Sequence, residues 1–124
     1  MHAHGLEKRS LGKTGMRVTP IGIGGAWLGW RCEKPVEVGV QTVLRGLELG
    51  VNVIDTSAAY INGESQMRVG IALREWFGRD KQREDLVIST KTGRFPGNEC
   101  DYSGERTRLS IMHSLEVMGL DYLD

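Results

Sequence analysis

Three polar residues of this sequence, Asp55, Tyr60 and Lys91, are together suited to giving a proton to a substrate or taking one from it. A phenol hydroxyl ordinarily titrates near ~10, and a neighbouring ammonium group favours the phenolate and so makes the hydroxyl a better acid. A carboxylate beside the ammonium group keeps that group charged and oriented. Such a trio can protonate a carbonyl oxygen, or take a proton from an alcohol, as a general acid or base. The prediction depends on whether the fold brings the three residues together.

The three residues lie at or just after segments that the sequence pattern predicts as strands. Apolar residues at helical spacing are followed by Gly50, Gly78 and Gly119, and a β-branched run comes after the first two of these glycines. With a first strand at 20–25, the predicted strands begin near residues 20, 51, 86 and 121. Such a spacing is typical of strand-helix-strand units and predicts a parallel sheet.

Each predicted helix is expected to bury one apolar stripe. The three stripes are Val36, Val40, Val43, Leu44 and Leu47; then Val69, Ala72, Leu73, Trp76 and Phe77; then Ile111, Met112, Leu115 and Met118. Ser103 is expected to cap the third helix. Ahead of the first strand, segments 6–11 and 16–19 flank the four residues 12–15, which predicts a β-hairpin.

Two architectures use such units, the doubly wound open sheet and the (β/α)8 barrel. The nucleotide-binding open sheet needs G-x-G-x-x-G after its first strand, but Trp27 stands at the third glycine. A barrel needs about 250 residues, whereas this chain has 124. We therefore expect an α/β fold, the N-terminal portion of a (β/α)8 TIM barrel with an N-terminal β-hairpin, truncated near the fourth strand. A flavodoxin-like domain is less favoured, because it needs a phosphate loop and a fifth strand.

Composition excludes several classes of function. The 16 Lys and Arg residues balance the 16 Asp and Glu residues, so no basic surface excess points to nucleic acid or anionic lipid. The longest weakly polar stretch, 20–30, is too short to cross a bilayer, and the N-terminus lacks the apolar region of a signal peptide. We expect a cytoplasmic protein.

Cys32 and Cys100 form no CxxC or Cys/His cluster, so neither a metal site nor a disulfide is expected.

Six segments resemble the N-terminal part of an aldo-keto reductase, in the order found in that family. They are LGKTGMRV at 11–18, GGAW at 24–27, DTSAAY at 55–60, GESQ at 63–66, STK at 89–91 and LEVMGLDYLD at 115–124. The likeness runs from about Lys8 to Asp124. It implies a (β/α)8 barrel whose N-terminal hairpin closes the bottom. It also implies hydride transfer between a nicotinamide cofactor, NADP or NAD, and a small carbonyl or sugar substrate.

The resemblance also assigns roles to individual residues. It implies that Tyr60 is the proton donor, that Lys91 and Asp55 tune it, and that Asp55 also contacts the nicotinamide ribose. Gly25, Ala26 and Trp27 are implied to lie under the nicotinamide end of the cofactor. Segment 95–105 is most similar to the sugar dehydrogenase branch, which oxidises aldoses such as L-galactose or L-fucose.

Some family features fall outside this sequence or differ in it. The family's catalytic His follows the end of the fourth strand, beyond Asp124, and the loops that hold the cofactor phosphates come from the last strands. Ile61 and Asn62 stand where many members have glycine just after the Tyr, and Gln66 replaces a frequent Glu.

We therefore expect residues 1–124 to form a partial NAD(P)-dependent aldo-keto reductase or sugar dehydrogenase domain that is inactive on its own. The alternative is a non-catalytic half-barrel module that self-associates or binds a partner through exposed strand edges.

Overall fold

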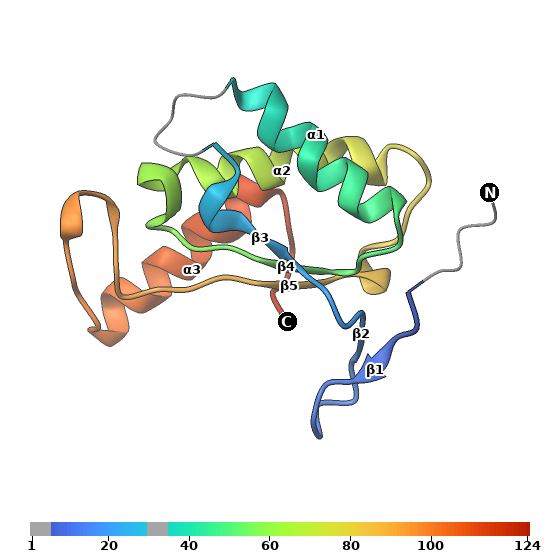
Figure 1. Cartoon of the computed structure of the whole chain (residues 1–124). Coiled ribbons are helices and arrows are strands. Elements are labelled where there is room, and N and C mark those ends of the chain that lie inside the picture. The colour runs from blue at the N-terminus through green and yellow to red at the C-terminus, as the bar shows by residue number, and fades with distance from the viewer. Residues whose placement is uncertain (1–5, 30–34) are drawn as a thin grey trace.

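The computed structural model describes residues 6–29 and 35–124. Its centre is a parallel sheet in the order β3 (Ile23–Gly24), β4 (Val53–Asp55) and β5 (Val87–Ser89). The helices α1 (Val36–Glu48), α2 (Glu64–Phe77) and α3 (Gly104–Met118) follow these strands in turn. Figure 1 shows α1 and α2 above the sheet, with α2 packed between α1 and α3. The predicted strand-helix units are confirmed.

The predicted hairpin is also confirmed. Strand β1 (Arg9–Ser10) pairs antiparallel with β2 (Arg17–Val18), and the hairpin extends below the sheet, away from the helices (Figure 1). The turn uses two glycines with left-handed backbone, Gly12 at φ 54° and Gly15 at φ 80°.

One buried side chain joins the hairpin to the sheet. The Asn52 Oδ1 atom accepts a hydrogen bond from the Thr19 backbone at 2.7 Å, and Asn52 Nδ2 donates to the Arg17 carbonyl at 2.9 Å. The Asn52 backbone N–H donates to Thr19 Oγ1 at 3.2 Å. Asn52 thus fixes where the chain leaves the hairpin, next to the start of β4.

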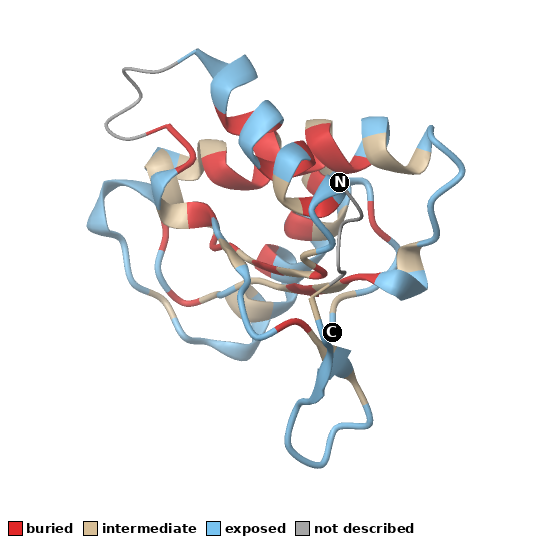
Figure 2. Ribbon diagram, turned by 45° about the vertical axis from the view of Figure 1, so that its right-hand side comes forward, coloured by how far each residue is buried: buried red, intermediate tan, exposed pale blue. Residues whose placement is uncertain are grey.

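The core lies between the sheet and the helices, and Figure 2 shows the buried residues gathered there while the hairpin is exposed. Ile54 and Ile88 are fully buried and stand opposite each other in the register of β4 and β5. Because strand side chains alternate, Asp55 and its register partner Ser89 face the other side, where both are half-buried. The strands therefore present Ile54 and Ile88 to the helices, whereas Asp55 and Ser89 share the opposite face with Val53 and Val87.

The predicted apolar stripe of α3 is partly wrong. Met118 is buried, but the side chains of Ile111 and Met112 are 40% and 55% exposed, and Ser110 and Ser114 are buried instead. Ser114 faces α2 and accepts a hydrogen bond from Gln66 at 2.8 Å, and nearer the end of α3 a Cβ added at Gly70 would lie 2.4 Å from the Val117 carbonyl oxygen. Such a contact favours small side chains over large apolar ones.

Both end signals predicted for α3 are confirmed. Ser103 Oγ accepts a hydrogen bond from the Arg106 backbone at 3.2 Å, and Gly119 has a left-handed φ of 68°. In the first stripe, Val36 is exposed because it occupies the first residue of α1, whereas its other four members are buried.

The predicted fourth strand is not formed at 121–124. Asp124 N donates to the Ile88 carbonyl at 3.1 Å, but the Ile88 N–H is bound by the Asp124 carboxylate at 2.9 Å. The same carboxylate pairs with Arg83 at 2.7 Å. The Asp124 carboxylate thus accepts the hydrogen bond of the Ile88 N–H. In a paired strand, a backbone carbonyl of the neighbouring strand would accept that bond.

Two further findings concern only the described part of the chain. No helix in it has the length and hydropathy that a membrane crossing requires. No group of three His, Cys, Asp or Glu side chains in it could hold a metal ion. Cys100 is an exposed free thiol, and Cys32 lies outside the described residues.

Candidate active site

The ends of β4 and β5 bring Asp55 and Lys91 into contact. Lys91 Nζ lies 2.6 Å from Asp55 Oδ2 and also donates to the Thr56 carbonyl at 3.1 Å. Ser89 Oγ donates to the other carboxylate oxygen, Asp55 Oδ1, at 2.7 Å. Since parallel strands end at the same edge of a sheet, residues 36 positions apart meet there.

Tyr60 completes the group from the loop after β4. Its backbone N–H donates to the Ser57 carbonyl at 3.2 Å, which bends the loop back toward the sheet. Lys91 Nζ lies 4.9 Å from the centre of the Tyr60 ring, within cation-π range. The structure thus places Asp55, Tyr60 and Lys91 in one cluster.

The surroundings of Lys91 set its charge. Partial burial lowers the pKa of Lys91, but the hydrogen bond to Asp55 and then the interaction with the Tyr60 hydroxyl raise it, and the net pKa is above its ordinary value. The Lys91 and Asp55 side chains are 48% and 49% exposed, so a ligand can reach both. Lys91 is therefore a fixed positive charge beside the Tyr60 ring near neutral pH.

The turn after Tyr60 has an unusual backbone. Ile61 and Asn62 both adopt left-handed angles, with φ of 51° and 53°. Asn tolerates this region, but a β-branched residue rarely adopts it, and such positions cost of order 1–3 kcal/mol. The double left-handed turn reverses the chain between Tyr60 and the start of α2, so it sets the direction from which Tyr60 enters the cluster.

Gly25, Ala26 and Trp27 form a single helical turn directly after β3. A Cβ added at Gly25 would lie 2.6 Å from Ser65 Oγ and 2.8 Å from Thr56 Oγ1, so glycine is needed for this close approach. The Trp27 side chain is 65% exposed. The turn lies at the same edge as the catalytic candidates, because Gly24 stands opposite Asp55 in the register of β3 and β4.

A pair of buried hydroxyl groups holds that turn in place. Ser65 Oγ donates to the Gly25 carbonyl at 2.8 Å and lies 2.7 Å from Thr56 Oγ1. These bonds connect the segments that follow β3 and β4 with the first turn of α2.

Two supporting residues were missed by the sequence analysis. Ser89, which binds Asp55, was signalled by its place at a strand end two residues before Lys91 and by the STK segment at 89–91, but it received no role. The buried Gln66 donates to Thr90 Oγ1 at 2.7 Å and to Ser114 Oγ at 2.8 Å, which ties α2 and α3 to the residue next to Lys91. The signal for Gln66 was its place in the GESQ segment at 63–66, where many family members have Glu.

A pocket of about 560 Å³ opens beside Tyr60. Asn62 and the segment 94–100 line it, so amide, guanidinium and carboxylate groups face the space next to the phenol ring.

The chain is similar to known proteins over most of its length. The sequence profile of the aldo/keto reductase family matches residues 20–124. L-galactose dehydrogenase from Arabidopsis thaliana is 38% identical over 121 residues, which is 96% of this chain and 36% of that protein. An aldo-keto reductase from Bacillus subtilis is 31% identical over 96% of this chain and 36% of its own length. The chain thus spans about a third of the length of these curated relatives.

Solved structures give the same result for the fold. An aldo-keto reductase from Bacillus halodurans superposes with a TM-score of 0.80 at 29% identity, covering 96% of this chain and 38% of that one. A Bombyx mori aldo-keto reductase, solved in complex with NADP, superposes with a TM-score of 0.77 at 21% identity, covering 97% of this chain and 36% of its own. The fold is therefore the N-terminal portion of a (β/α)8 barrel with an N-terminal hairpin. The flavodoxin-like alternative is wrong. With its profile match, its relatives and its fold in agreement, this chain belongs to the aldo/keto reductase family.

Proposed function

We propose that this chain is the N-terminal part of an NAD(P)-dependent oxidoreductase domain that interconverts a small carbonyl compound and its alcohol. The observation that carries the proposal is the 2.6 Å contact of Lys91 with Asp55, with the Tyr60 ring 4.9 Å from the same Nζ atom. Membership of the family and the NADP-bound neighbour support a nicotinamide cofactor.

The residues at the strand ends fit one end of such a cofactor. Asp55 offers a half-exposed carboxylate that can accept hydrogen bonds from ribose hydroxyls, and the exposed Trp27 ring offers an apolar surface for a flat heterocycle. Gly25 and Ala26 complete a turn that brings the chain close to Asp55. When bound there, the nicotinamide supplies or accepts the hydride.

The chain's own residues handle the proton. During reduction, the Tyr60 hydroxyl donates its proton to the substrate carbonyl oxygen, and during oxidation the phenolate takes the proton back. The Lys91 ammonium group stabilises the phenolate by its positive charge. Asp55 keeps Lys91 charged and in place, and Ser89 holds the Asp55 carboxylate through its second oxygen.

A sugar is the substrate class that we propose. The relative with 38% identity is an L-galactose dehydrogenase, and an aryl-alcohol dehydrogenase from Pestalotiopsis microspora is 32% identical. Between these two classes, the pocket beside Tyr60 favours the sugar, since Asn62, Arg94 and Glu99 in its wall can bind several hydroxyl groups. An aryl alcohol could use at most one of these exposed polar groups, so they would add little affinity for it.

We further propose that the 124-residue chain, which corresponds to about a third of its relatives, neither binds NADPH tightly nor turns over a substrate by itself. Titration with NADPH, followed by tryptophan fluorescence, tests this, and micromolar quenching would contradict it.

We also propose that the whole protein works in the cytoplasm. Self-association of the chain through its strand edges stays a prediction.

The function is tested in a chimera that joins residues 1–124 to the remaining part of the Arabidopsis relative. Tyr60→Phe should lower kcat about 10²–10⁴-fold and leave NADPH affinity nearly unchanged, because the hydroxyl acts in the transition state. Tyr102→Phe is the matched control and should keep full activity. It changes an exposed tyrosine in the segment between β5 and α3.

Full activity in Tyr60→Phe would refute the role of Tyr60. The substrate class is tested by comparing L-galactose with benzyl alcohol, and a higher kcat/KM for benzyl alcohol would refute the sugar assignment.

A further inference from the structure

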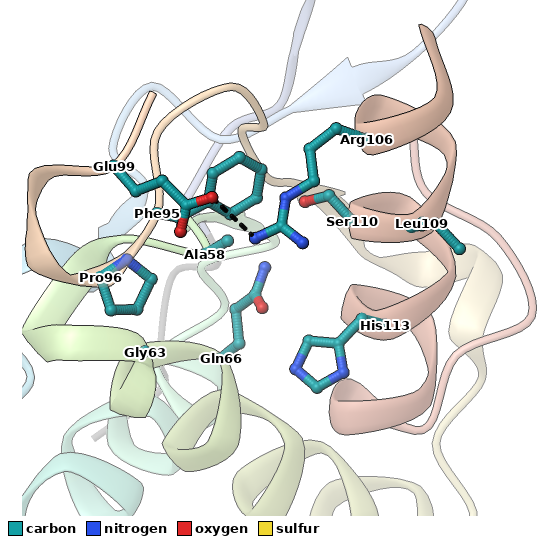
Figure 3. Close-up of a pocket in the computed structure, with 10 residues that line it drawn as sticks. All are labelled: Ala58, Gly63, Gln66, Phe95, Pro96, Glu99, Arg106, Leu109, Ser110 and His113. Atoms are coloured by element: carbon teal, nitrogen blue, oxygen red, sulfur yellow. Dashed lines mark ion pairs between the residues drawn. The ribbon is translucent and has the colours of Figure 1, made fainter. Parts of the chain in front are cut away.

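A second pocket of about 490 Å³ lies between the start of α2, the segment before α3 and α3 itself (Figure 3). Residues of α3, including Arg106 and His113, form one wall, and Gln66 of α2 lies across from them. Asp55, Tyr60 and Lys91 are not among the lining residues. The pocket shares Phe95, Pro96 and Glu99 with the pocket beside Tyr60, whereas Arg106 and His113 do not line that other pocket. Ligand binding at Arg106 can therefore be measured without any activity of the candidate active site.

Three polar side chains point into this pocket. Figure 3 shows the guanidinium of Arg106, the carboxamide of Gln66 and the imidazole of His113 directed toward the same space from two helices. Arg106 and His113 are seven positions apart on α3, which places them on one face of the helix. Gln66 already donates its side-chain N–H groups to Thr90 Oγ1 and Ser114 Oγ, so the main donor open to a ligand is Arg106 on α3.

Arg106 is held in place but not saturated. Its guanidinium lies 4.2 Å from the centre of the Phe95 ring, within cation-π range. Its ion pair with Glu99 has an N to O distance of 3.6 Å, longer than a hydrogen bond. Its Nε atom is buried without a hydrogen-bond partner in the described part of the chain. Arg106 therefore has donors left for an incoming acid.

The remaining lining selects the kind of acid. Arg106 is the single residue of always-positive charge among the lining residues, and Glu99 adds a negative charge at the same place. Because Glu99 already balances the charge of Arg106, an incoming anion must displace Glu99 from the guanidinium, and the displaced carboxylate repels a doubly charged phosphate more strongly than a monoanion. Phe95 and Leu109 provide apolar surface for the rest of the ligand.

We propose that this pocket binds a small organic monocarboxylate. The ligand's carboxylate replaces Glu99 at the Arg106 guanidinium and forms the bidentate pair that the present 3.6 Å contact does not make. Its apolar body lies against Phe95 and Leu109. Ala58 and Gly63, which flank the Tyr60 turn, also line the pocket, so the bound acid lies beside the loop that carries Tyr60.

The test is an NMR titration of the ¹⁵N-labelled 124-residue chain with benzoate, with benzyl alcohol and inorganic phosphate as comparison probes. Benzoate should shift the Gln66 side-chain amide and the backbone amides of 106–113 in a saturable manner. Benzyl alcohol and phosphate should bind at least about tenfold more weakly, because they lack either the charge or the apolar body. Equal binding of benzyl alcohol, tighter binding of phosphate or no saturation with benzoate would overturn the proposal.

Two variants test the role of Arg106. Arg106→Gln should weaken benzoate binding about tenfold or more. The control Arg108→Gln changes an exposed arginine on the same helix that lies outside the pocket, and it should leave the affinity unchanged. Similar losses in both variants would show a nonspecific charge effect and would refute the site.

A third variant keeps the test decisive if Arg106→Gln disturbs folding. Glu99→Gln should tighten benzoate binding several-fold, because the neutral amide competes less well for Arg106. Unchanged or weaker binding in Glu99→Gln would refute the exchange of carboxylates at this residue.

Discussion

The Nζ atom of Lys91 and the Oδ2 atom of Asp55 lie 2.6 Å apart, although the two residues are 36 positions apart in the chain. This contact raises the pKa of Lys91 above its ordinary value, against the lowering effect of partial burial. A lysine pKa that is higher in the folded than in the unfolded chain contributes stability below the unfolded value. That contribution is lost as the pH rises through the folded value.

The first prediction concerns this titration. We expect the Lys91 side chain to titrate above 10.5, and Asp55→Asn to lower its pKa and to reduce the loss of stability at alkaline pH. ¹³C NMR of the lysine Cε signals measures the pKa, with Lys91 assigned through Lys91→Arg. Asp101→Asn, a carboxylate on the loop before α3, should leave the Lys91 titration unchanged. A Lys91 pKa that does not respond to Asp55→Asn would contradict the assigned cause.

The second prediction concerns the packing of the turn after β3. Gly25→Ala should destabilise the chain by about 1–3 kcal/mol, because the new Cβ would lie 2.6 Å from Ser65 Oγ. Gly24→Ala is the matched control: no atom lies within 4 Å of its added Cβ, and its φ of −88° suits any residue. Urea unfolding measures both, and equal midpoints for the two variants would show that the close approach is not limiting.

The third prediction concerns the link between hairpin and sheet. Asn52→Ala should cost about 2–3 kcal/mol, since it leaves the buried Thr19 N–H and other backbone groups without the partners they now have. Gln41→Ala removes an exposed side-chain amide with one bond to Glu37 and should change stability by less than about 0.5 kcal/mol. Chemical unfolding of the two variants decides the matter, and a small effect of Asn52→Ala would mean that the hairpin contributes little to stability.

The fourth prediction concerns the left-handed turn that follows Tyr60. Asn62→Ala should destabilise the chain by about 1 kcal/mol, because alanine tolerates a φ of 53° less well than asparagine. Asn62→Gly should keep or increase the stability, since glycine adopts this region without strain. Thermal unfolding compares them, and an alanine variant at least as stable as the glycine variant would refute a left-handed Asn62.

The sequence by itself determined the order and spacing of the main elements. Helix ends follow from local chemistry, such as the cap at Ser103 and the left-handed Gly119, and local chemistry is visible in a short window. Parallel strands of predictable length end at a common edge, so the nearness of Asp55 and Lys91 also followed from the pattern.

The tertiary structure alone decided which partners hold those residues. The bonds from Ser89 to Asp55 and from Gln66 to Thr90 depend on strand register and helix orientation, which no local pattern specifies. The packing of α3 on α2 turned Ser114 toward Gln66, whereas Ile111 stays 40% exposed. Distances between elements determine such choices, and they exist only once the whole chain has packed.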